Sequence, residues 1–153
     1  MIDRRRVLFI LGVATLSLLL PRWSPALSPE IEDGLKTSKF VYISSTRKDG
    51  TLSKPAEIWF MYWNGSVYVG SSPKSWRARR INWKRPGAKI WVGKRDGPSF
   101  AASGAIVKEP EAEQALLKTY GEKYADGWSK WEKSFREGFK DGSRVLIKYT
   151  PTP

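Results

Sequence analysis

The chain has 153 residues, with 27 lysine and arginine residues against 15 acidic residues, for a formal net charge of +12. It contains no cysteine and no histidine, which excludes disulfides, thiolate nucleophiles, Ser-His-Asp triads and the usual metal and haem ligands. This length predicts one domain and the charge predicts anionic partners, while any redox chemistry must be carried by a bound organic cofactor.

The first 28 residues have the pattern of an export signal. Arginines at positions 4, 5 and 6 precede an apolar run at 7–20, which is shorter than the roughly 20 residues of a membrane span and suits a signal peptide. The small residues at 24–26 predict cleavage after Ala26. The paired arginines also resemble the twin-arginine export motif, with an ordinary secretory signal and a retained N-terminal membrane anchor as alternatives. We therefore expect residues 29–153 to form a domain that is exported to the periplasm, or anchored at the inner membrane and facing it.

The basic character belongs to the folded domain as well as to the signal, because residues 29–153 still carry 23 cations and 14 acids.

This domain is expected to open with a short helix at 30–37, with Ser28 as its N-cap and Pro29 in its first position. Residues 39–46 predict a first strand, and the Asp49-Gly50 turn leads to a second strand at 51–63. The Asn64-Gly65 dipeptide then predicts a hairpin turn before a third strand at 67–70.

The second half alternates between helices and strands. Residues 76–83 predict a helix, 88–94 and 100–108 two strands, and 110–124 a helix that Asp126-Gly127 is expected to break. A closing strand is predicted at 144–150. The whole pattern is mainly β, of the α+β class, with about six strands that tight turns make largely antiparallel.

An aromatic stripe follows the expected break near residue 126. Trp128, Trp131, Phe135 and Phe139 recur at helical spacing. We expect this stripe to be one helix face packed against the sheet, with Trp131 buried together with the other three side chains.

The segment 70–86 follows the predicted hairpin and gathers small residues, hydroxyl groups and then cations. Backbone N–H groups and serine hydroxyls can donate to a phosphate, and arginine adds bidentate charge-assisted bonds. The order of these residues therefore suits a phosphate site. From composition alone, the alternative is a basic surface helix that packs its tryptophans on the barrel.

Several stretches in sequence order carry a resemblance to a known family. Residues 40–50 (FVYISSTRKDG), 55–60 (PAEIWF) and 64–72 (NGSVYVGSS) resemble the opening of the pyridoxamine 5'-phosphate oxidase-like split barrels, in particular the flavin- and deazaflavin-dependent reductase branch. Residues 75–81 (SWRARRI), 103–105 (SGA) and 144–151 (RVLIKYTP) continue the resemblance, which covers residues 37–151.

The resemblance implies a six-stranded antiparallel split β-barrel with peripheral helices, forming a homodimer that binds FMN or a deazaflavin at the subunit interface. It implies that the cofactor phosphate meets the hydroxyls and cations of 71–80 and that the ring system lies along 54–59. No protein nucleophile and no metal are needed, because the cofactor carries the hydride. The implied cofactor-binding residues are Lys54, Ala56, Glu57, Trp59, Ser71, Ser72, Lys74, Ser75, Trp76, Arg77 and Arg80.

Two of these residues depart from the family pattern. Trp76 replaces a small or charged residue and would either stack on the ring or block it. Glu57 is harmless to a phosphate if it faces outward and disfavours one if it faces inward.

The sequence therefore predicts an exported flavin- or deazaflavin-binding oxidoreductase. The alternative is a non-catalytic basic split-barrel module that uses 76–85 to bind anionic ligands or a membrane surface. The export signal argues against a nucleic acid partner. Haem handling is a weaker alternative, because histidine is missing.

Overall fold

The computed structural model describes residues 27–153, so all but the last two residues of the export signal predicted at 1–28 lie outside the described residues. At the start of this part, Leu27 packs against the core and Ser28 caps the first helix by accepting a hydrogen bond from the Ile31 N–H (3.3 Å). Between residues 27 and 153 no helix combines the length and the apolar character that crossing a membrane requires.

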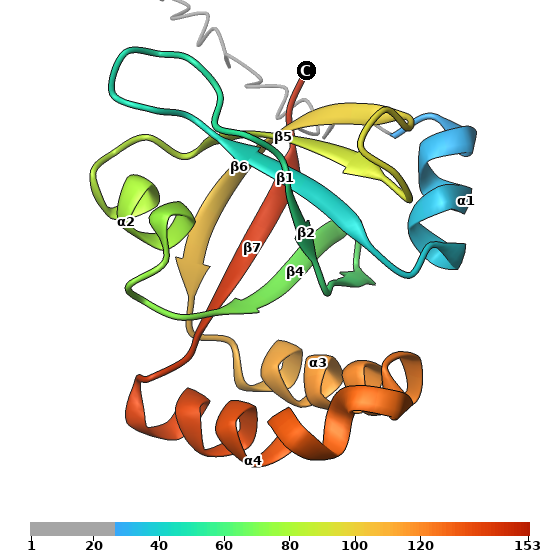
Figure 1. Cartoon of the computed structure of the whole chain (residues 1–153), viewed down its shortest axis with the longest axis vertical. Coiled ribbons are helices and arrows are strands. Elements are labelled where there is room, and N and C mark those ends of the chain that lie inside the picture. Colours follow the sequence, from blue (N-terminus) through green and yellow to red (C-terminus); the bar gives the residue numbers. More distant parts are fainter. Residues whose placement is uncertain (1–26) are drawn as a thin grey trace, which may run out of the picture.

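The described residues form one curled antiparallel sheet with helices around it, as predicted (Figure 1). The helices are α1 (Pro29–Thr37), α2 (Trp76–Asn82), α3 (Pro110–Lys123) and α4 (Ala125–Asp141). The strands are β1 (Val41–Ser45), β2 (Ala56–Ile58), β3 (Met61–Trp63), β4 (Ser66–Ser71), β5 (Gly87–Val92), β6 (Ser99–Val107) and β7 (Val145–Pro151). Their order across the sheet is β2-β1-β5-β6-β7-β4-β3. In Figure 1, α1 and α2 lie on opposite sides of the barrel and the α3–α4 pair lies across one end.

The sheet has seven strands because the strand predicted at 51–63 is divided in two. β2 pairs with β1 at one edge of the sheet, whereas β3 pairs with β4 at the other edge. The chain therefore crosses between the two edges at Trp59 and Phe60, and this crossing closes the half-barrel. An alternating apolar pattern does not reveal such a change of partner, because both short strands have the same two-residue period.

Tyr120 of α3 and Tyr124, at the junction of α3 and α4, satisfy backbone polar groups at this crossing. The Tyr120 hydroxyl donates to the Trp59 carbonyl oxygen (2.7 Å), and the Tyr124 hydroxyl accepts from the Phe60 N–H (2.9 Å). The Tyr124 hydroxyl also donates to the Lys39 carbonyl oxygen (2.7 Å). Burial raises the pKa of both tyrosines, so both remain protonated donors at physiological pH. These bonds fasten the end of α3 to the crossing that closes the half-barrel.

Replacing Tyr124 by phenylalanine is expected to lower the free energy of unfolding by about 1–3 kcal/mol, because the buried Phe60 N–H loses its acceptor. Urea unfolding measures the loss. Tyr149→Phe is a matched control, because the Tyr149 hydroxyl is buried and has no hydrogen-bond partner among the described residues. Tyr149→Phe should be neutral or stabilising, and an equal loss in both variants would contradict the role given to Tyr124.

A lysine on α3 should make stability depend on pH. Burial lowers the pKa of Lys123 to about 8, from an ordinary value of 10.5. As pH falls from 10.5 toward 8, the unfolded chain binds a proton that the folded chain does not, so stability falls. Unfolding curves should therefore show parent stability increasing relative to Lys123→Met as pH rises from about 8 to about 10. A parent-minus-variant difference that stays flat over this range would contradict the prediction.

The second helix of the pair differs from its prediction in two details. The predicted break at Asp126-Gly127 is wrong by two residues, since α3 ends at Lys123 and both residues lie in the first turn of α4. Trp128, Phe135 and Phe139 are buried against α3 and the sheet, as predicted. Trp131 is 41% exposed, so the prediction that it is buried with the other three is wrong.

Candidate functional site

A cleft of about 480 Å³ lies between β1, the loop that follows it, β2 and α2. We call it the cationic cleft. Its lining consists of Ile43, Ser45, Arg47, Ser53, Lys54, Ala56, Ser75, Trp76, Arg77 and Arg80. The lining contains four cations and three hydroxyl groups but no acidic residue.

The cations of α2 are held by the local structure around the start of this helix. Ser75 is the N-cap, and its Oγ accepts from the Ala78 N–H (3.3 Å) and from the Ser71 hydroxyl (2.9 Å). Arg77 in turn donates through Nη1 to the buried Ser71 Oγ (3.3 Å). Arg80 donates through Nη1 to Ser45 Oγ on β1 (2.7 Å). Each guanidinium is therefore anchored by one nitrogen and keeps other donors for a ligand.

Positive charge in the cleft is not compensated by the protein. Arg47, Lys54, Arg77 and Arg80 form no ion pair within residues 27–153. Burial lowers the pKa of Arg80, and the positive charges of Arg47 and Arg85 lower it further. An anion bound here would relieve this repulsion and accept charge-assisted hydrogen bonds.

Arg47 is a cleft residue that was not among the predicted site residues. It lies on the β1–β2 loop and donates to the Leu52 carbonyl oxygen (2.8 Å). Asp49 accepts from the Thr51 N–H (3.0 Å) and from its hydroxyl (2.7 Å), bonds that lower the pKa of the carboxyl group and shape the turn. The turn itself was predicted from Asp49-Gly50. No local pattern indicates that the loop brings its arginine against α2.

The structure brings most of the eleven predicted cofactor residues together. Lys54, Ala56, Ser75, Trp76, Arg77 and Arg80 line the cationic cleft. Glu57 and Trp59 line a neighbouring hollow that also includes Arg77. Ser71, Ser72 and Lys74 line neither: Ser71 is buried behind Arg77, and Ser72 Oγ accepts from the Lys74 N–H (3.2 Å) in the turn before α2.

The neighbouring hollow, which we call the aromatic pocket, has a volume of about 380 Å³. Its lining is Glu57, Ile58, Trp59, Gly70, Arg77, Tyr120, Trp131, Phe135 and Arg144. Trp59 is held flat against Tyr124, with ring centroids 4.3 Å apart and planes 5° apart, and its edge meets Tyr120. The two hollows meet at Arg77, so a basic region and a flat apolar wall lie next to each other.

The two residues that depart from the family pattern can now be placed. Glu57 does not line the cationic cleft, and it accepts a hydrogen bond from the Tyr42 hydroxyl (2.7 Å). Its charge is therefore outside the cationic cleft, in the lining of the aromatic pocket. Trp76 borders the cleft but is 61% exposed, so it covers the rim and does not fill the hollow.

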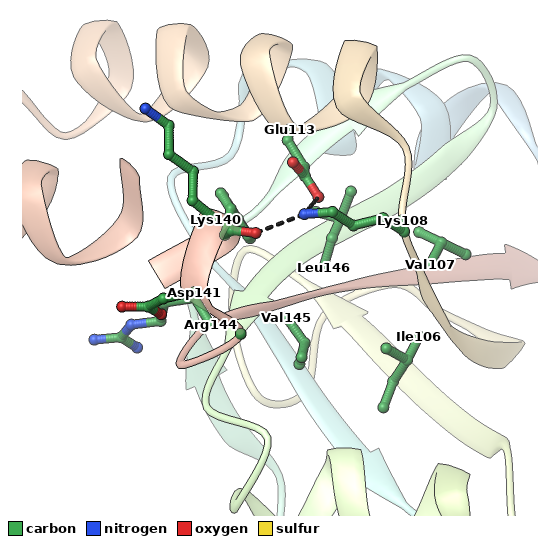
Figure 2. Close-up of a pocket in the computed structure, with 11 residues that line it drawn as sticks. Ile106, Val107, Lys108, Glu113, Lys140, Asp141, Arg144, Val145 and Leu146 are labelled. Carbon is green, nitrogen blue, oxygen red and sulfur yellow. Dashed lines mark hydrogen bonds and ion pairs between the residues drawn. The ribbon is translucent and has the colours of Figure 1, made fainter. Parts of the chain in front are cut away.

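A third hollow, of about 420 Å³, is formed by β6, β7 and the end of α4 (Figure 2). Both acids and cations line it. Figure 2 shows the Lys108 amine turned toward the Glu113 carboxylate, at 2.9 Å, and this amine also donates to the Phe139 carbonyl oxygen. Because two acids stand among its three cations and Lys108 is paired with one of them, the charge of this hollow is more nearly balanced than that of the cationic cleft. Within residues 27–153 no cluster of acidic side chains is arranged to hold a metal ion.

Comparison of the sequence with protein-family models and with curated proteins finds no match. Solved structures do match. HutZ of Vibrio cholerae, described as a haem storage protein, has a TM-score of 0.58 at 15% identity, over 83% of this chain and 91% of its own. A proposed pyridoxamine 5'-phosphate oxidase of Listeria innocua has a TM-score of 0.57 at 15% identity, over 80% and 91%. An F420 reductase has a TM-score of 0.52 at 20% identity, over 80% and 93%.

These likenesses confirm the predicted fold. The chain has the split-barrel fold of pyridoxamine 5'-phosphate oxidase-like proteins, built here from seven antiparallel strands and peripheral helices. At such low identities the likeness concerns the fold alone.

Proposed function

We propose that this protein binds a phosphate-bearing flavin, FMN, or a deazaflavin in the cationic cleft, and that it acts as an oxidoreductase. The observation that carries the proposal is the set of four cations without acidic partners, Arg47, Lys54, Arg77 and Arg80, beside a flat aromatic wall. Such a site suits a ligand with an anionic end and a planar end.

The residues present fit such a cofactor at both ends. Arg77 and Arg80 would hold the phosphate with the guanidinium nitrogens that their serine anchors leave free, and Ser75 adds a hydroxyl. The ring system would lie along β2 toward Trp59. When bound, the cofactor supplies hydride transfer. The protein then has to bind, orient and shield it, which requires no cysteine or histidine.

The experiment that tests the proposal is a titration of the purified full chain with FMN, with a deazaflavin and with riboflavin. Absorbance and quenching of tryptophan fluorescence report binding. We expect stoichiometric uptake of FMN or the deazaflavin with a shifted visible band. Riboflavin has the same ring system as FMN but no phosphate group, so the difference in affinity measures the contribution of the phosphate. We expect riboflavin to bind at least tenfold more weakly than FMN.

Two outcomes would contradict the proposal. If neither FMN nor the deazaflavin binds, the protein is a split barrel without this redox chemistry. If riboflavin binds as tightly as FMN, the cations do not recognise a phosphate. A Soret band in protein purified without added cofactor would instead indicate haem, despite the absence of histidine from the chain.

The assembly and location of the protein are part of the same proposal. We propose a homodimer with the cofactor at the subunit interface, exported through the N-terminal segment or anchored by it. Light scattering of the purified chain tests the dimer. Mass spectrometry of protein recovered from the periplasm tests cleavage after Ala26, and a chain recovered intact in the membrane fraction would support the anchor.

A further inference from the structure

The outward side of α2 carries an aromatic and cationic surface that meets the proposed cofactor site only at Trp76, on the rim of the cleft. Trp76 and Trp83 are 61% and 51% exposed, and their ring centroids are 6.3 Å apart. Arg79, exposed between them, has its guanidinium 5.5 Å from the centroid of the Trp76 ring, and Arg85 lies 5.2 Å from that of Trp83. We call the group Trp76, Arg79, Trp83 and Arg85 the α2 outer face.

The helix geometry directs most of this face away from the cleft, since Arg79, Trp83 and Arg85 do not line it. Residues three or four apart lie on the same side of a helix, which places Trp76, Arg79 and Trp83 together. The same geometry turns Ala78 and Ile81 inward, where they are buried in or packed against the barrel core. Both exposed tryptophans therefore lie on the side that faces away from the barrel core.

The charge of this region has one sign. No acidic residue occurs between Glu57 and Asp96. The cations of that interval are Lys74, Arg77, Arg79, Arg80, Lys84, Arg85, Lys89, Lys94 and Arg95. The occupant of the outer face must therefore tolerate, or neutralise, a concentrated positive charge.

We propose that the α2 outer face docks on the surface of a membrane that contains anionic lipids. Tryptophan prefers the boundary between headgroups and acyl chains, where its ring is apolar and its N–H is wet. Arginine beside it meets lipid phosphates while its stem covers apolar surface. On the loop across the cleft, Leu52 is 41% exposed and offers a further apolar contact.

Two other occupants fit the surface less well. A second copy of the face would bring like charges together, which opposes association. Single-stranded nucleic acid needs free ring faces for base stacking. Here the guanidinium groups of Arg79 and Arg80 both lie 5.5 Å from the centroid of the Trp76 ring, and Arg85 lies over Trp83.

Because the chain has no cysteine, a single introduced cysteine can report the environment of one position. Asn82→Cys places a polarity-sensitive fluorophore on the outer face, and Glu137→Cys places the same label on the exposed side of α4. The full-length protein is mixed with vesicles of phosphatidylcholine, with or without phosphatidylglycerol. This design reports contact by the face itself, whether or not the N-terminal segment also inserts.

We expect the label at position 82 to shift to the blue only with phosphatidylglycerol vesicles, and less as salt increases, whereas the label at 137 does not respond. In the Asn82→Cys background, Arg79→Gln should weaken partitioning about fivefold. Trp83→Ala should also weaken it, and Trp131→Ala, which removes a tryptophan exposed elsewhere, should not.

Four results would overturn the proposal. The label at 82 could stay in water while the protein binds the vesicles, or both labels could respond alike. Phosphatidylcholine alone could give the same shift. Finally, the shift could occur without lipid, either with rising protein concentration or equally with a single-stranded oligonucleotide, which would identify a second copy or a nucleic acid as the occupant. The readout does not involve flavin, so failure here is distinct from failure of the proposed cofactor site.

Discussion

Replacing Phe135 by alanine is expected to lower the free energy of unfolding by about 3–5 kcal/mol. The side chain is 6% exposed and packs at the centre of the layer between α3, α4 and the sheet. Its ring lies 5.6 Å from Tyr120, 5.7 Å from Trp128 and 6.2 Å from Phe139, measured between centroids. Removing it leaves a cavity that three neighbouring aromatic rings cannot close. Urea unfolding followed by circular dichroism measures the loss.

Trp131→Ala is the matched control on the same helix. Trp131 shares the helical stripe but is 41% exposed at the mouth of the aromatic pocket, so we expect a loss of only about 1 kcal/mol. A loss as large as that of Phe135→Ala would show that the stripe acts as one buried face, as the sequence alone predicts.

A double-mutant cycle with Gly70 tests the packing itself. A Cβ atom at Gly70 would lie 2.4 Å from Cε1 of Phe135, so Gly70→Ala alone forces the Phe135 ring or the backbone around it to shift. In the Phe135→Ala background that clash is gone, and adding Gly70→Ala should cost little further stability. Strictly additive losses would mean that α4 does not pack on β4 at this point.

The features that the sequence predicted correctly have local causes. The Asn64-Gly65 turn needs two residues that tolerate positive φ, and the structure has φ of 47° and 75° there. Ser28 comes directly before α1 and caps it as predicted, because a serine hydroxyl replaces a missing backbone acceptor in the first turn. Signals of this kind depend on a few neighbouring residues and can be recognised without the rest of the fold.

The features that the sequence did not predict depend on contacts between distant segments. The division of the strand at Trp59 is stabilised by Tyr120 and Tyr124, more than 60 residues later. Arg47 reaches the cleft only because its loop folds toward α2. The helical spacing places Trp131 on the same face as its buried neighbours, but it does not show how much of that face is covered by α3 and the sheet. The order of residues in 70–86 likewise does not show that Ser71, Ser72 and Lys74 lie behind or beside the cleft and not in its lining.

Replacing Arg77 by alanine is expected to weaken binding of FMN or the deazaflavin by about 1.5–3 kcal/mol, or roughly 10- to 150-fold in Kd. Arg77 is the cation that lines both the cationic cleft and the aromatic pocket. Its bond to the buried Ser71 hydroxyl fixes the guanidinium, so little ordering is left to be done on binding. Lysine at this position keeps the charge but loses the planar fork, so Arg77→Lys should fall between parent and Arg77→Ala. Fluorescence titration with FMN measures all three affinities.

Arg79→Ala separates a specific contact from a general loss of charge. It removes the same charge two residues away, but Arg79 is exposed on the outer side of α2 and lines neither hollow. We expect its FMN affinity to stay within about threefold of the parent, since an exposed charge at a distance is screened by salt. Riboflavin affinity should change little in either variant, because it carries no phosphate for Arg77 to hold. If Arg77→Ala and Arg79→Ala weaken FMN binding equally, the cleft attracts anions only through its net charge. If Arg77→Ala weakens riboflavin binding as much as FMN binding, Arg77 contacts the ring end of the cofactor, and Arg47 or Arg80 binds the phosphate.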